Sequence, residues 1–104
     1  IEMLNTDNKR VSTHWLSVLK LKDTNITPLD IIEALEKENI ESRPIWKPMH
    51  MQPVFKKYPF FNHNKKGISV SEDLFNTGIC LPSDVNMNKK EQMKVIEIIR
   101  SLFI

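Results

Sequence analysis

The sequence predicts a small α+β domain, in which a mainly antiparallel sheet is covered by helices. Two observations lead to this fold class. Segments rich in strand-forming residues alternate along the chain with segments that have helical spacing and helix-capping residues. The length of 104 residues and the apolar content of 40% suit one domain with a modest core.

The first predicted strand covers residues 14–22, with the sequence HWLSVLKLK. Its apolar residues put apolar groups on both faces, as expected for a strand at the centre of a sheet. Trp15 is therefore expected in the core. Residues 1–11, ahead of this strand, hold few apolar side chains and are predicted to be an arm or linker.

The clearest predicted helix lies in the segment TPLDIIEALEKENI, residues 27–40. Thr27 is a typical N-cap, Pro28 suits the first helical position, and Asp30 places a carboxylate near the unpaired N–H groups. Asn39 is a plausible left-handed stop. The residues spaced for one buried face are Ile31, Ile32 and Leu35.

Two further strands are predicted to be short. The segment ESRPIW, residues 41–46, reads as a strand that ends before Pro48. The apolar segment ICLP, residues 79–82, is predicted to be a third strand. Between them, one helical turn is expected to begin at Pro53. Cys80 lies between apolar neighbours and is expected to be a core residue rather than a nucleophile.

Two more helices are predicted to begin at capping boxes. Ser69 and Glu72 have the spacing of this motif ahead of residues 70–77, and Asn88 and Glu91 repeat it. The last helix then carries apolar residues at helical intervals, which are Val95, Ile96, Ile99, Leu102 and Phe103.

Composition argues against several classes of function. Fifteen basic and thirteen acidic residues are mixed along the chain, which gives no electrostatic footprint for nucleic acid or for a membrane surface. No apolar run reaches the length of a transmembrane helix, and no signal peptide is visible. The three histidines are widely spaced, so no metal site is predicted.

The single cysteine favours a reducing compartment, so the cytoplasm is the expected location. Lys65 and Lys66 are expected in a solvated loop.

The segment SRPIWKPMHMQPVFKKYPFF, residues 42–61, concentrates prolines, aromatic residues and basic residues. Arg43, Trp46, Lys47 and His50 lie within eight residues of one another, and prolines stiffen the backbone between them. A rigid, exposed loop with these groups suits recognition of a planar or anionic ligand. Alternatively, the large apolar side chains fold the loop onto the core and leave the charges in water. The residues alone favour neither of these two interpretations over the other.

The segment IESRPIWKPMHMQPVFKKYP, followed by SEDLFNTGICLPSD and EQMKVIEIIR, closely resembles the C-terminal end of the DegT/DnrJ/StrS sugar aminotransferases. The upstream segments STHWLSVLKL and EKENIESRP also match, in the same order. The resemblance implies that residues 12–104 are the C-terminal small domain of an aspartate-aminotransferase-type fold. Asn39 departs from the glycine that the family often has, although both tolerate a left-handed turn.

This resemblance implies a parent enzyme that uses pyridoxal phosphate. Such enzymes transfer an amino group, usually from glutamate, to a keto group on a nucleotide-linked sugar that feeds polysaccharides and glycans. The implied partners are a large cofactor-binding domain of the same enzyme and a second subunit in a homodimer. In the family, the Schiff-base lysine and the other cofactor ligands lie far upstream. This chain alone is therefore expected to bind no cofactor and to catalyse nothing.

The resemblance also places the segment RPIWKPMH at the mouth of the family's active site. It implies that His50, Trp46 and Lys47 are candidate contacts of the sugar nucleotide. Arg43 either contacts the substrate or braces the loop by a salt bridge. Two functions from other classes stay open: a free-standing α+β module that binds a small molecule or regulates, and a nucleic-acid-binding module. The mixed charge disfavours the second.

Overall fold

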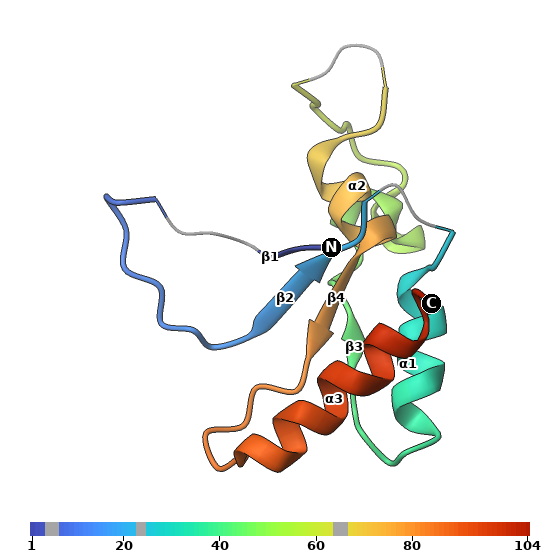
Figure 1. Cartoon of the computed structure of the whole chain (residues 1–104). Coiled ribbons are helices and arrows are strands. Elements are labelled where there is room, and N and C mark those ends of the chain that lie inside the picture. Colours follow the sequence, from blue (N-terminus) through green and yellow to red (C-terminus); the bar gives the residue numbers. More distant parts are fainter. Residues whose placement is uncertain (4–6, 23–24, 64–66) are drawn as a thin grey trace.

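The computed structural model describes residues 1–3, 7–22, 25–63 and 67–104. Four strands form one sheet in the order β1-β2-β4-β3, and each neighbouring pair is antiparallel. The strands are β1 (Glu2–Met3), β2 (Ser17–Lys20), β3 (Arg43–Pro44) and β4 (Gly78–Leu81). The helices are α1 (Pro28–Glu36), α2 (Val70–Thr77) and α3 (Lys89–Ser101), with two short 3-10 turns, η1 (Met49–Met51) and η2 (Pro53–Phe55). This architecture confirms the predicted α+β class (Figure 1).

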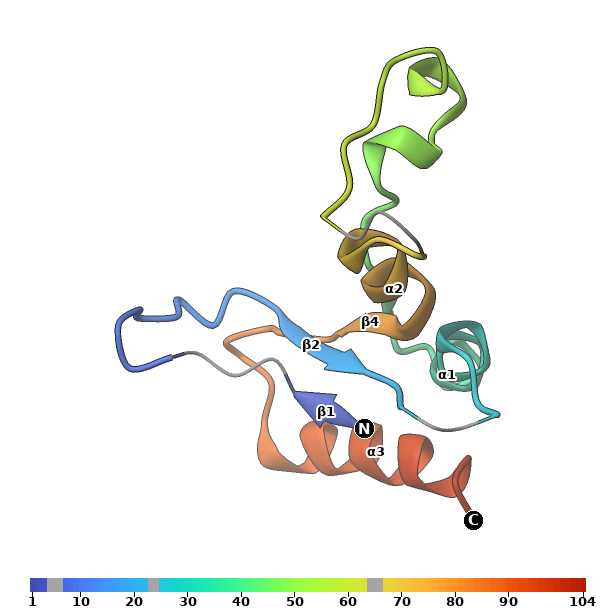
Figure 2. The same cartoon turned by 90° about the horizontal axis from the view of Figure 1, so that it is seen from above.

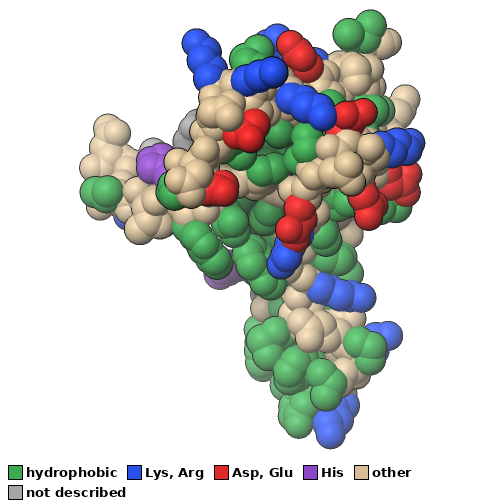
Figure 3. Space-filling model, turned by 90° about the horizontal axis from the view of Figure 1, so that it is seen from below, with side chains coloured by type: hydrophobic (Ala, Val, Ile, Leu, Met, Phe, Trp, Pro, Cys, Tyr) green, Lys and Arg blue, Asp and Glu red, His purple; other side chains and the backbone are tan. Residues whose placement is uncertain are grey.

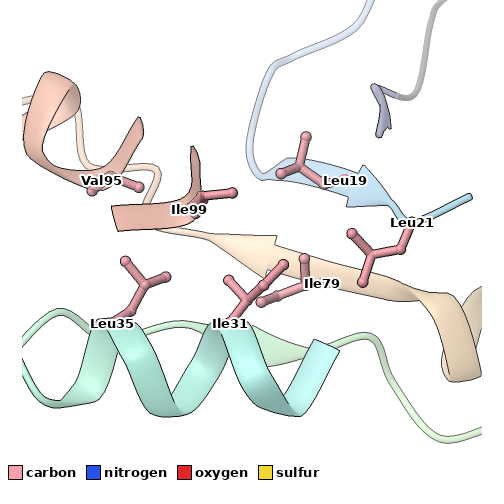
Figure 4. Packing of buried hydrophobic residues seen from close by; sticks show 7 residues of the cluster. All are labelled: Leu19, Leu21, Ile31, Leu35, Ile79, Val95 and Ile99. Carbon is pink, nitrogen blue, oxygen red and sulfur yellow. The ribbon is translucent and has the colours of Figure 1, made fainter. Parts of the chain in front are cut away.

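The core lies between the sheet and the helices α1 and α3, whereas α2 lies on the opposite side of the sheet from α3 (Figure 2). Its buried side chains, shown in Figure 4, are Leu19, Leu21, Ile31, Leu35, Ile79, Val95 and Ile99. Ile31, Leu35 and Ile79 are fully buried. Burial of one such side chain contributes about 1.5–3 kcal/mol. The cluster therefore fixes the sheet against both helices.

All three predicted helix starts are confirmed, and each is a complete capping box. The predicted end of α1 is confirmed as well. Asn39 has a positive φ of 56°. The Ile40 N–H donates to the Leu35 carbonyl at 3.0 Å, and the Asn39 N–H donates to the Glu36 carbonyl at 2.9 Å. This pair of bonds is a Schellman motif.

The position of Trp15 corrects the sequence prediction. The predicted strand began at residue 14, but β2 begins at Ser17, and Trp15 is 72% exposed rather than in the core. His14 has a φ of 50°, which turns the backbone out of the extended conformation just before the strand. The apolar pattern continues through this turn, so the pattern alone placed the strand boundary too early. The central place of β2 in the sheet is confirmed.

The first residues also differ from the prediction. Within the predicted arm, Glu2 and Met3 pair with Lys20 and Leu19 and form the edge strand β1. Two exposed residues carry too little pattern to predict a strand. The division of the chain at residue 12 stays a prediction, and Lys65 and Lys66 lie outside the described residues.

Residues 46–63 form a segment that projects away from the sheet, which we call the projecting segment (Figures 1 and 2). The helical turn predicted at Pro53 is confirmed as η2. Tight local bonds shape the segment: the Met51 N–H donates to the Pro48 carbonyl at 3.0 Å. Gln52 Nε2 also donates to the Lys47 carbonyl at 3.0 Å. The projection lengthens the molecule to 47 Å along its longest axis.

Candidate functional site

A groove of about 1050 Å³ lies beside β3 and the end of β4. Its walls come from residues 15–16, the stretch 39–47, the stretch 80–84 and the start of α3. Glycine at position 78 allows this packing, because a Cβ there would collide with the Ile45 side chain and the Leu74 carbonyl. The groove therefore joins segments that lie far apart in the sequence.

Three of the four predicted site residues line this groove, namely Arg43, Trp46 and Lys47. The Arg43 side chain pairs with Glu41. Arg43 Nε donates a hydrogen bond to Glu41 Oε1 at 2.7 Å. The sequence left a bracing role and a substrate role open for Arg43. The ion pair with Glu41 is local and exposed, and both roles stay predictions. Both Arg43 and Lys47 are exposed, so each also reaches solvent.

Trp46 has an aromatic neighbour in the groove. The Trp15 ring lies beside it, with 6.1 Å between the ring centroids and 35° between the ring planes. Trp46 is 65% exposed. Sequence reasoning missed Trp15 as a site residue because it placed this side chain in the core. The sequence around Trp15 does not show whether this residue lies inside the strand or ahead of it, because the start of β2 is set by the pairing of Ser17 with Leu81.

His50, the fourth predicted residue, lies outside the groove. Its side chain is only 17% exposed, and its ring stacks on Phe60 with 3.6 Å between centroids. His50 Nε2 lies 3.4 Å from Glu72 Oε1, but this pair lacks the alignment of a hydrogen bond. The contact joins the projecting segment to the start of α2. Its substrate role stays a prediction.

Glu72 is held in place by the capping box of α2. Its Oε2 accepts a hydrogen bond from the Ser69 N–H at 2.8 Å. This N–H is the main reason why the pKa of Glu72 lies below its ordinary value, and the Ser69 hydroxyl and His50 act in the same direction. The other carboxylate oxygen is therefore presented to His50 by a fixed, ionised side chain.

The remaining chemical groups show no catalytic arrangement among the described residues. Cys80 is buried, as predicted, and burial raises the pKa of its thiol, which makes it a poor nucleophile. In the described ranges, no three His, Cys, Asp or Glu residues are grouped so that they could hold a metal ion. No helix in that part of the chain is long and apolar enough to cross a bilayer.

A pyridoxal phosphate site needs a lysine in a desolvated setting. The described lysines are exposed, except for Lys20, which pairs with Asp73. The residues that the structure describes therefore do not supply such a setting.

Two comparisons with known proteins show what this chain is similar to. The model of the DegT/DnrJ/EryC1/StrS aminotransferase family matches residues 1–100. A relative from Bacillus subtilis (strain 168), named "Putative pyridoxal phosphate-dependent aminotransferase EpsN", is 52% identical over 93 residues. The match covers 89% of this chain but 24% of that relative, so the chain spans about a quarter of its length. The chain belongs to the DegT/DnrJ/EryC1/StrS aminotransferase family.

Proposed function

We propose that the chain is the C-terminal domain of a pyridoxal-phosphate-dependent enzyme that aminates a nucleotide-linked keto sugar for polysaccharide or glycan synthesis. The observation that carries the proposal is the groove, which gathers Arg43, Trp46 and Lys47 in a chain of this family. In this proposal the domain supplies one wall of the substrate site. A large domain of the same enzyme supplies the cofactor and its lysine, and glutamate is the amino donor.

The surface of the chain supports a large covering partner. A compact monomer of 12.2 kDa is expected to expose about 6100 Å². This chain exposes 8696 Å². Hydrophobic side chains gather in the middle of one face and along the projecting segment (Figure 3). We therefore expect the large domain, and a second subunit of a homodimer, to cover much of this surface in the cytoplasm.

His50 has a separate place in this proposal. It lies against Phe60 and Glu72 rather than in the groove. It would reach the substrate only if the covering domain brings the substrate to the projecting segment. A role in holding that segment fits its contacts without this condition.

The test compares absorbance spectra of pyridoxal phosphate with the 104-residue chain and with the longer reading frame that contains it. We expect a reducible Schiff-base band only with the longer protein, which should also convert a nucleotide-linked keto sugar to the amino sugar in the presence of glutamate. A stoichiometric, reducible band on the 104-residue chain would contradict the proposal. A reading frame without a cofactor domain would instead favour a free-standing small-molecule-binding module.

A further inference from the structure

We infer that the projecting segment of one copy of the chain docks in a groove beside α1 of a second copy, and that the second copy docks in the same way on the first. The proposed homodimer leaves open which surfaces meet, and this inference names two that fit each other. Its place in the enzyme rests on that proposed homodimer, but the docking itself depends on the two surfaces and not on amino transfer.

The projecting segment is both basic and apolar. Although acidic and basic residues are mixed along the chain as a whole, residues 46–63 contain three lysines and no Asp or Glu. Two aromatic side chains on the segment are exposed, Phe61 at 88% and Tyr58 at 58%. Lys56 and Lys57, which precede them, are exposed as well. Such a surface fits a partner that offers an apolar pocket together with negative charge.

A second, smaller groove of about 320 Å³ lies at the end of α1, and we call it the α1 groove. Its walls are formed by Ile32, Glu36, Asn39, Ile40, Glu41 and Ser42. It shares the stretch 39–42 with the larger groove, whereas Ile32 and Glu36 line only the α1 groove. Ile32 and Ile40 are half-buried and pack against the core, so they form an apolar wall that an aromatic ring would cover.

The α1 groove is acidic, in contrast to the projecting segment. Residues 30–41 contain five acidic residues and one lysine. Ion pairs within the chain hold Glu38 and Glu41. Among the described residues, Glu36 forms no such pair and is exposed. The groove therefore presents one carboxylate that can receive a lysine of another chain.

The two surfaces lie toward opposite ends of the molecule. In Figure 1 the projecting segment is in the upper half and the turn that follows α1 is at the lower end. Two copies placed side by side and antiparallel therefore bring each projecting segment to the α1 groove of the other copy. Such a pair is closed, because both surfaces of each copy are used within it.

The exposed area of the chain is large enough for this contact. The chain exposes 8696 Å², whereas a compact monomer of this mass would expose about 6100 Å². The excess is larger than the roughly 800 Å² that each partner buries in a standard interface. Burial of exposed aromatic side chains then supplies the affinity, and the charges set which surfaces meet.

Charge reversal in two separate chains tests the contact. Lys57→Glu puts a negative charge on the projecting segment, and Glu36→Lys puts a positive charge in the α1 groove. Either variant alone brings like charges together at both contacts of the pair, so its dimer dissociation constant should rise about tenfold. An equimolar mixture of the two variants should restore association, because every contact of the mixed pair then joins opposite charges. Analytical ultracentrifugation over a range of concentrations measures each dissociation constant.

Glu97→Lys is the matched control. It makes the same charge change as Glu36→Lys at an exposed position of α3 outside the α1 groove, so it should leave the dissociation constant unchanged. Association of the unaltered chain should also weaken as salt is added. Circular dichroism checks that each variant keeps its fold, which is expected because all three altered side chains are exposed.

The inference is overturned if the unaltered chain stays a monomer at every concentration. It is overturned equally if the mixture of variants does not restore association, or if Glu97→Lys weakens association as much as Glu36→Lys does. Protection of Lys56 and Lys57 from trypsin in a longer, monomeric protein would show that the large domain covers the segment instead, and this result also overturns it. None of these measurements involves the cofactor, so failure of the docking and failure of the Schiff-base test are told apart.

Discussion

At the scale of single residues, His50 shows how a site residue can be predicted by its neighbours in the sequence and still lie elsewhere in space. It is three residues from Lys47, yet the turn η1 carries it away from the groove and against Phe60. The direction of a side chain after two prolines depends on contacts with Glu72, which lies 22 positions further along the chain. No local pattern contains that information.

His50→Ala is expected to loosen the projecting segment without unfolding the core. The stacked ring contributes about 1 kcal/mol, so opening of the segment should become several times more frequent. The measurement is the rate of tryptic cleavage after Lys56 and Lys57, which are exposed. Met49→Ala serves as the control, because Met49 lies in the same turn and is 62% exposed. Equal cleavage of His50→Ala and the unaltered chain would contradict the anchoring role.

At the scale of helices and strands, the sequence predicted most where the signal is local. The capping boxes of α2 and α3 were predicted because both partners lie three residues apart, and the structure confirms both. It also shows a capping box at α1, where the sequence predicted only that Thr27 is the N-cap and that Asp30 lies near the unpaired N–H groups. The strands were placed less well. Residues 41–46 were predicted as a strand, but only Arg43 and Pro44 pair with β4. Strand limits depend on distant partners, so apolar patterns within one segment do not fix them.

The capping box of α1 predicts a defined loss of stability in acid. The Thr27 hydroxyl, and then the Thr27 N–H, hold the pKa of Asp30 below its ordinary value of 3.8. A lowered folded-state pKa means that this stabilisation is complete above pH 3.8 and is lost as the pH falls through the folded-state value. Asp30→Asn should therefore be less stable than the unaltered chain at neutral pH, with the difference shrinking in acid.

Thermal unfolding of both proteins from neutral pH down to strongly acidic pH measures this effect. Glu36→Gln is the control, because Glu36 is exposed at the other end of the same helix. A difference between Asp30→Asn and the unaltered chain that stays constant at every pH would show that the carboxylate charge of Asp30 does not stabilise the helix.

At the scale of the whole molecule, the chain is larger than its length requires. Its radius of gyration is 15.8 Å, whereas a compact domain of this length is expected near about 13 Å. The sequence could not predict this shape, because the apolar residues of the projecting segment would have served equally well in a core. Whether these apolar residues are buried or exposed depends on whether other protein surface is available to cover them.

We expect the isolated chain to bind a hydrophobic dye and to self-associate as its concentration rises. Phe61→Ser should reduce both, because Phe61 is 88% exposed on the projecting segment. Analytical ultracentrifugation and dye fluorescence measure the two effects. A clean monomer that binds no dye would argue against a large covering partner.

The edges of the sheet decide what form such self-association takes. Both edge strands, β1 and β3, are two residues long, and Pro44 in β3 has no N–H to offer to another strand. The two edges therefore offer very few backbone N–H and C=O groups with which a further strand could pair. Contacts through apolar side chains should give small assemblies that dissociate on dilution, and growth of fibrils from the native fold is disfavoured.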